Sequence, residues 1–96
     1  MSALRNRARG EVVLAIDGAP VRLCLTLGAL AELEAAFDTD GFAALGERLA
    51  HLSASDLITI LAALTGRPGA ELAAARIDPR EAASAVAAAF RVAFEE

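Results

Sequence analysis

The chain has little of what metal and redox sites require. Its 96 residues include one cysteine, one histidine and no lysine, tryptophan or tyrosine. Cys24 has no second cysteine for an intramolecular disulfide, and with His51 it cannot make a closed zinc site unless several carboxylates also take part. We therefore interpret Cys24 as a packed apolar side chain in a strand and His51 as a residue at a helix end. We predict no metal and no cofactor.

The motifs of common enzymes are also missing. The glycines do not form the GxGxxG or GxxxxGKS/T loops that cradle phosphates, and the serines lack the GxSxG turn of a nucleophile elbow. Paired carboxylates such as Asp38 and Asp40 lie in a turn, whereas general acid–base catalysis needs a sheltered pair with shifted pKa values. The sequence predicts a protein that is not an enzyme.

Charge and hydropathy argue against two classes of partner. A net charge of −4 opposes binding to nucleic acid, and without Trp or Tyr there is no platform on which bases stack. No apolar run approaches the roughly 18 residues that span a bilayer. The N-terminal MSALRNRARG has arginines but no apolar stretch after them, unlike a signal peptide. We expect a cytoplasmic protein that binds neither nucleic acid nor membrane.

The residues that are present predict one domain, 1–96, with a hairpin followed by helices. We expect a flexible Arg-rich arm over residues 1–9, a β-hairpin over 10–26 and helices over 27–96. The fold class is then α+β, an N-terminal β-hairpin packed against four or five mostly short α-helices. The helices are expected over residues 27–37, 42–52, 56–65, 70–76 and 79–95.

The hairpin is predicted from two β-rich runs, Glu11–Ile16 and Val21–Thr26, around Asp17-Gly18. This dipeptide favours a type I′ turn, in which both central residues need a positive φ. Leu14 then pairs with Val21, and one face of the hairpin becomes apolar. A four-residue loop, DGAP, is the alternative, and it leaves the same residues on each face. The apolar face consists of Val12, Leu14, Ile16, Val21, Leu23 and Leu25.

Capping and packing signals support the helices. Thr26, Ser53 and Asp78 each stand where an N-cap is expected, and Asp56 completes a capping box with Ser53. Gly46 lies inside a predicted helix, where it predicts a close crossing with another helix. One apolar stripe is expected on the helix over 27–37, formed by Leu27, Leu30, Leu33 and Phe37.

The last predicted helix is apolar on more than one side. Its core face is expected to be Val86, Phe90, Ala93 and Phe94, with Ala82 and Ala83. Ala85, Ala89 and Val92 form a further strip between this face and the polar stripe. Either the helix is sandwiched inside the fold, or the strip contacts a partner or a second copy. Small alanine side chains suit close helix approach, so we favour the contact.

The hairpin edges are a second candidate contact. Arg22 is the only charged residue of the second strand, and an uncovered strand edge invites another strand. The alternative is that helices or the Arg-rich arm cover both edges. Arg22, Ala85, Ala89 and Val92 are therefore the candidate partner-contact residues.

One long segment combines several of these features in a fixed order. Asn6–Phe37 contains an Asn, an Arg-Gly-Glu triplet, an Asp-Gly turn, a Leu-rich second strand and an Ala-Leu-Ala-Glu-Leu-Glu helix. In this it resembles the gene transfer agent family of small phage-tail proteins, and GFAALGERLA and SASDLITILAALTG extend the resemblance to about residue 66. The residues that carry it are Asn6, Arg9, Gly10, Glu11, Gly18, Leu23, Thr26, Leu30, Ala31, Glu32 and Glu34.

This resemblance implies a protein encoded among the tail genes of a phage-like particle. It would be either a tail assembly chaperone, which binds the tape measure protein or another tail protein, or a structural component retained in the tail. We favour the chaperone, because a tube subunit usually builds its ring from inter-subunit β-sheet and this mostly helical chain has two short strands. A chaperone acts in the cytoplasm, whereas a component lies in the particle.

Overall fold

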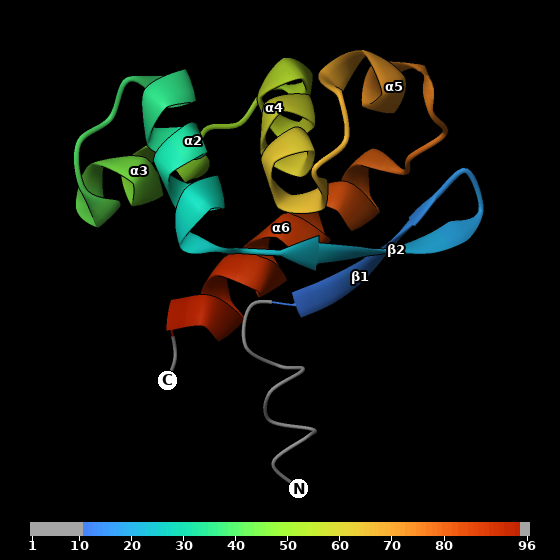
Figure 1. Ribbon diagram of the computed structural model, residues 1–96, viewed down its shortest axis with the longest axis horizontal. Coiled ribbons are helices and arrows are strands. Elements are labelled where there is room, and N and C mark those ends of the chain that lie inside the picture. The colour runs from blue at the N-terminus through green and yellow to red at the C-terminus, as the bar shows by residue number, and fades with distance from the viewer. Residues whose placement is uncertain (1–10, 95–96) are drawn as a thin grey trace, which may run out of the picture.

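A computed structural model describes residues 11–94 of the protein. The predicted Arg-rich arm, 1–9, lies outside this range. An antiparallel hairpin is followed by a set of helices, which confirms the α+β class (Figure 1). The elements are β1 (Glu11–Ile16), β2 (Ala19–Cys24), α2 (Leu27–Phe37), α3 (Phe42–Leu49), α4 (Ala54–Thr65), α5 (Gly69–Ala74) and α6 (Pro79–Phe94).

The hairpin has the predicted turn and register. Asp17 and Gly18 have φ of 55° and 80°, the positive values that a type I′ turn needs. Leu14 pairs with Val21, and Ile16 pairs with Ala19 beside the turn. The apolar face is turned inward as expected, with Leu14, Ile16 and Leu23 buried. Val12, Val21 and Leu25 pack at its margin.

Replacing Gly18 tests the turn directly. Gly18→Val should lower the free energy of unfolding by about 1 kcal/mol or more, because a β-branched residue resists positive φ. No other atom lies within 4 Å of the position that a Cβ would take, so the cost comes from the backbone alone. Ala19→Val is the matched control, since valine suits a strand. Equal urea midpoints for the two variants would mean that the turn tolerates valine.

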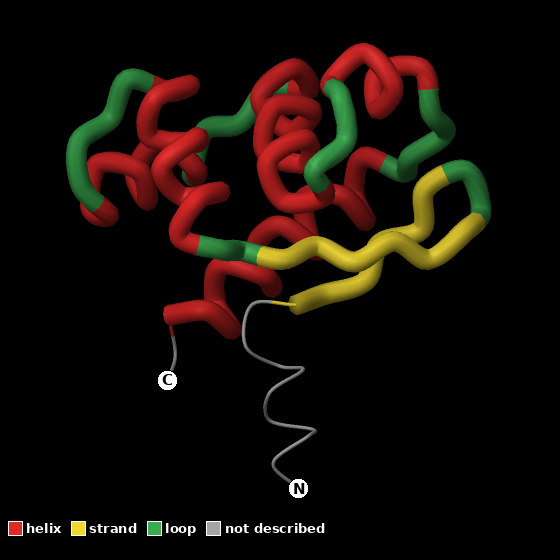
Figure 2. Tube along the Cα trace, viewed as in Figure 1, coloured by secondary structure: helices red, strands yellow, loops and turns green. Residues whose placement is uncertain are grey.

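Two helices cover the inner face of the hairpin. α6 packs mainly against β1, α4 contacts β2 as well as α2 and α5, and α4 and α6 also contact each other. Figure 2 shows the twisted hairpin running along one side of the helices, with its turn near the loop between α5 and α6. The core between these layers contains fully buried side chains from three elements, namely Leu23, Leu33, Ile60 and Leu61. The hairpin is stable here because the helices bury its apolar face.

Three helices, α2, α4 and α6, begin at the predicted N-caps. The Thr26 hydroxyl accepts a hydrogen bond of 3.0 Å from the Ala29 N–H at the start of α2. Ser53 and Asp56 form a complete capping box at α4. The carboxylate of Asp78 accepts from the Arg80 N–H at 2.8 Å, where α6 begins. These local bonds satisfy N–H groups that a helix start leaves without partners.

Two packing expectations are wrong. Leu27 is 79% exposed, because the buried side of α2 is formed by Ala29, Leu30 and Leu33 and its first residue projects past them. Gly46 is exposed, and nothing lies within 4 Å of a Cβ built on it, so no close helix crossing requires this glycine within the described chain. α3 lies at the periphery and packs mainly on α2.

Candidate interaction surface

Residues 11–94 hold no cluster of side chains that suits metal binding. In this range no polar or charged residue is classed as buried, and no three His, Cys, Asp or Glu residues lie close enough to hold a metal ion. Within the same residues no helix is long and apolar enough to cross a membrane. The candidate features of these residues are exposed faces, strand edges and grooves.

The predicted contact strip on α6 is largely inside the fold. Ala85 is 7% and Ala89 0% exposed, so a partner cannot reach these two side chains. Val92 is half-buried. α6 contacts β1, β2 and α4, which places it between the hairpin and another helix. The sandwiched helix is therefore the arrangement observed, and the contact expected at Ala85 and Ala89 is corrected.

A single arc of α6 explains this correction. Its buried residues recur at spacings of three and four, as one helical face requires. They are Ala82, Ala85, Val86, Ala89 and Phe90. Ala83, which was expected on the core face, is exposed. The predicted core face and the predicted contact strip are thus two halves of one buried surface.

The outer face of the hairpin is left uncovered by the helices. Val13 is 59% exposed, and Ala15, Pro20 and Arg22 are exposed beside it. Across the strands Val13 stands opposite Arg22 and Ala15 opposite Pro20. The sole cysteine, Cys24, is a free thiol of intermediate exposure on β2. This face combines small apolar side chains with one arginine.

The two outer strand edges carry backbone groups that the hairpin does not pair. In a two-residue hairpin the residues beside the turn exchange hydrogen bonds, and the pairs then alternate. Val13 and Ala15 belong to the pairs that point their N–H and C=O groups outward. Among the described residues, no additional backbone hydrogen bond reaches these two. Within residues 11–94, no other strand therefore pairs with the edge of β1.

The turn of the hairpin is anchored to the loop before α6. The Asp17 N–H donates to the Arg76 carbonyl at 2.9 Å, and the Arg76 N–H donates to the Asp17 carboxylate at 2.7 Å. The two residues are 59 positions apart, and no local pattern indicates this pair. The anchor holds the far end of both strands against the helical layer, which fixes the direction in which their edges face.

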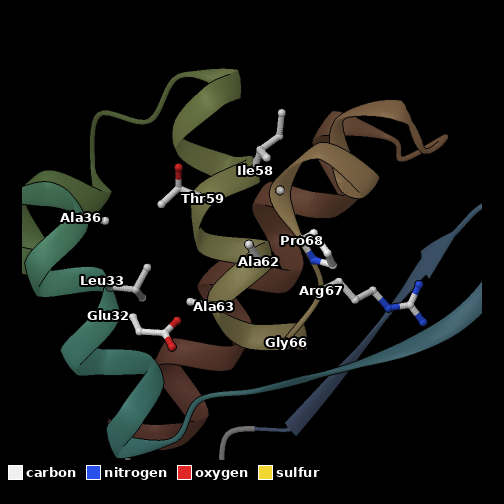
Figure 3. A pocket seen from close by; sticks show the side chains of 11 residues that line it. Glu32, Leu33, Ala36, Ile58, Thr59, Ala62, Ala63, Gly66, Arg67 and Pro68 are labelled. Carbon is white, nitrogen blue, oxygen red and sulfur yellow. The ribbon is translucent and has the colours of Figure 1, made fainter.

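A shallow groove lies between α2, α4 and the loop that follows α4. Its volume is about 570 Å³, and its walls include Leu33, Ile58, Ala62 and Ala63. Figure 3 shows the Glu32 carboxylate turned toward the α4 wall and the Arg67 side chain directed away from the groove. Arg67 pairs with Glu71 at 3.3 Å. With a mainly small and apolar lining, the groove suits a protein segment better than a charged metabolite.

Arg48 joins the peripheral α3 to both neighbouring helices. Its guanidinium pairs with the Asp56 carboxylate at 2.9 Å and donates to the His51 carbonyl at 2.9 Å. It also lies over the Phe37 ring, 4.8 Å from the centroid, in a cation–π contact. One side chain thus connects α2, α3 and the start of α4. This role is structural, and His51, at the end of α3, takes part through its backbone.

The pKa of the Asp56 carboxyl is lowered from its ordinary value of 3.8. The largest cause is the hydrogen bond from the Ser53 N–H, 3.0 Å from the carboxylate, followed by the bond from Arg48 at 3.1 Å. Both donors favour the charged form. A lowered pKa in the folded state means that Asp56 stabilises the fold fully above the ordinary value and progressively less as the pH falls below it.

Asp56→Asn should therefore be less stable than the wild type at neutral pH. The difference between their urea midpoints should narrow as the pH falls below 3.8, the ordinary value for this carboxyl. Arg48→Gln should reproduce part of the loss, because the Ser53 donor remains. A difference that stays constant from neutral to acid pH would show that the charge of Asp56 does not act through these bonds.

Comparison with known proteins gives the family. Residues 9–96 match the family described as phage tail tube protein, GTA-gp10. No curated protein and no solved structure matches the chain. The match includes the hairpin and every helix of the described structure, so the resemblance inferred from Asn6–Phe37 is confirmed and extends to the C-terminal helix. The chain belongs to the GTA-gp10 family of phage tail tube proteins.

Proposed function

We propose that the protein is a non-catalytic structural component of a phage-like tail, associated with the tail tube and retained in the finished particle. The observation that carries this is the family match over residues 9–96, whose description names the tail tube. It favours the tail component over the chaperone that the sequence first suggested. The partners are then other tail proteins, and the site of action is the particle.

The exposed surfaces of the protein support a function in binding other proteins. The inner face of the hairpin is used for the core, while Val13 on its outer face is exposed and no other described segment pairs with the β1 edge. The groove between α2 and α4 is a second apolar surface, separate from the outer face of the hairpin. Two separate surfaces would allow one copy to touch more than one neighbour, as a component of an assembly must.

Mass spectrometry of purified particles tests this proposal. A tail component should be present in particles after removal of loosely bound protein, at a constant ratio to the tube subunit from one preparation to the next. Particles separated from their tails provide the control, since the chain should remain with the tail fraction. Its absence from intact particles, while it is abundant in the producing cells, would overturn the proposal.

A tail assembly chaperone for the tape measure protein is the second candidate. The observation that favours it is the small sheet, because residues 11–94 form a single two-stranded sheet and five helices. Co-expression should then raise the solubility of the tape measure protein, and the two should co-purify from cells. The chain should also be missing from finished particles, which is the opposite of the result expected for a component.

A further inference from the structure

We propose that the outer edge of β1 pairs with β1 of a second copy. The two strands would run antiparallel about a two-fold axis at Val13 and give one four-stranded sheet, in the order β2-β1-β1-β2. This goes beyond the proposed function, which requires contacts with tail proteins but does not say that the chain binds itself. The supporting observations are the difference between the two edges, the register and the exposure of Val13.

The two hairpin edges differ in how well they resist another strand. The outward positions of β2 include Pro20, which has no N–H to donate, and Arg22, a charged residue. Proline and charged residues are devices that block edge pairing. The outward positions of β1 are Glu11, Val13 and Ala15; all three keep their N–H groups, and the one charged residue, Glu11, stands at the end of the strand. One edge is therefore protected and the other is open.

The pattern of outward groups selects a register for two copies. Residues 11, 13 and 15 point their backbone groups outward, so these must face one another in the second copy. Centring the pair on Val13 places 13 opposite 13 and 11 opposite 15, which uses all three positions. Centring it two residues away pairs fewer of them. The register at Val13 thus makes the most hydrogen bonds.

This register also covers the one large hydrophobic side chain that is exposed on the described strands. Val13 is 59% exposed on the outer face, and at the two-fold axis it would pack against its own copy. Cross-strand pairs of β-branched residues stabilise a sheet. On the inner face, Val12 of one copy would stand opposite Leu14 of the other and continue the apolar layer of both hairpins. In this register valine meets valine on the outer face, and apolar side chains meet on the inner face.

The association should be weak and closed. A single pair of six-residue strands is short of the roughly 1,200–2,000 Å² that stable interfaces bury. The contact uses the same strand on both copies, so it ends at a dimer. Sedimentation velocity over a wide range of protein concentration should show a monomer–dimer equilibrium without larger species.

A charge at the axis tests the interface. Val13→Lys should weaken dimerisation roughly tenfold or more, because two lysines would stand directly opposite each other. Ala87→Lys adds the same charge at an exposed position of α6 and should leave dimerisation unchanged. Both variants should keep the wild-type melting temperature. A wild-type protein that stays monomeric at every concentration, or equal dimerisation of both variants, would overturn the proposal.

Engineered cysteines test the register. In a Cys24→Ser background, Val13→Cys should form a disulfide dimer under mild oxidation, because opposed Cα atoms lie about 5.5 Å apart. Ala15→Cys is the matched control on the same face, with its two copies roughly 14 Å apart along the strands. Equal cross-linking of the two, or preferential cross-linking of Ala15→Cys, would contradict this register. These experiments use purified protein alone, so their failure is distinct from absence of the chain from particles.

Discussion

Ala89→Glu is expected to unfold the protein or to lower its free energy of unfolding by roughly 4 kcal/mol or more. Ala89 is 0% exposed and lies on α6, between the hairpin and α4. A glutamate there would bury a charge and also force a larger side chain into a packed layer. A domain of this size has only about 5–15 kcal/mol of stability, so the loss is a large fraction of the total.

The matched control is Ala87→Glu, the same change two residues earlier on the exposed side of α6. It should shift stability by no more than about 0.5 kcal/mol. Val92→Glu, at a half-buried position, should fall between the two. Urea denaturation followed by circular dichroism measures all three. If Ala89→Glu and Ala87→Glu have the same midpoint, α6 is not sandwiched in solution.

Leu23→Ala is expected to cost about 2–5 kcal/mol, the usual range for a buried leucine replaced by alanine. Leu23 is 0% exposed at the centre of the inner hairpin face, and its strand packs on α4. The change removes apolar contacts and leaves a cavity where hairpin and helices meet. Because α4 is central to the helical layer, we expect loss of the whole fold rather than local fraying of the hairpin.

Val13→Ala provides the comparison for Leu23→Ala. Val13 is 59% exposed on the opposite face of the same sheet, so its truncation should cost well under about 1 kcal/mol. Urea midpoints of both variants give the ratio of the two effects. Similar losses would mean that the inner and outer faces of the hairpin are wrongly assigned, and with them the surface proposed for a second copy.

The turn, register and faces of the hairpin could be predicted because their signals are local, whereas the second strand spans Ala19–Cys24 instead of the expected Val21–Thr26. Asp17-Gly18 supplies two adjacent residues that accept positive φ, and that turn fixes which residues pair. Since side chains alternate along a strand, the register also decides which face is apolar. The helix starts were predictable for the same reason, because Thr26, Ser53 and Asp78 each bond to N–H groups within three residues.

The packing of α6 could not be predicted in the same way. Alanine occupies both its buried and its exposed sides, so hydropathy gives little contrast around the helix. The arc around Ala89 is buried because two layers meet there, and that arrangement depends on the whole chain. Leu27 was wrongly expected to be buried for a related reason. It lies on the apolar stripe of α2, but a stripe does not show whether another element covers each of its residues.

Long-range polar contacts also could not be predicted from the sequence. The pairing of Asp17 with Arg76 joins a turn to a loop 59 positions further along the chain, and nothing in the sequence around either residue indicates its partner. Arg48 reaches Asp56 and Phe37 only because α2, α3 and α4 converge. The open edge of β1, by contrast, follows from the hairpin once the structure shows that no described segment pairs with it.

The central claim is that this chain serves the phage-like tail through its surface. The most direct measurement is a count of intact tails, by electron microscopy, in particles from a producing strain that lacks the chain. The count should be close to zero, return to normal with the wild-type protein and remain normal with the exposed control Ala87→Lys. Intact tails in normal number without the chain would contradict the claim.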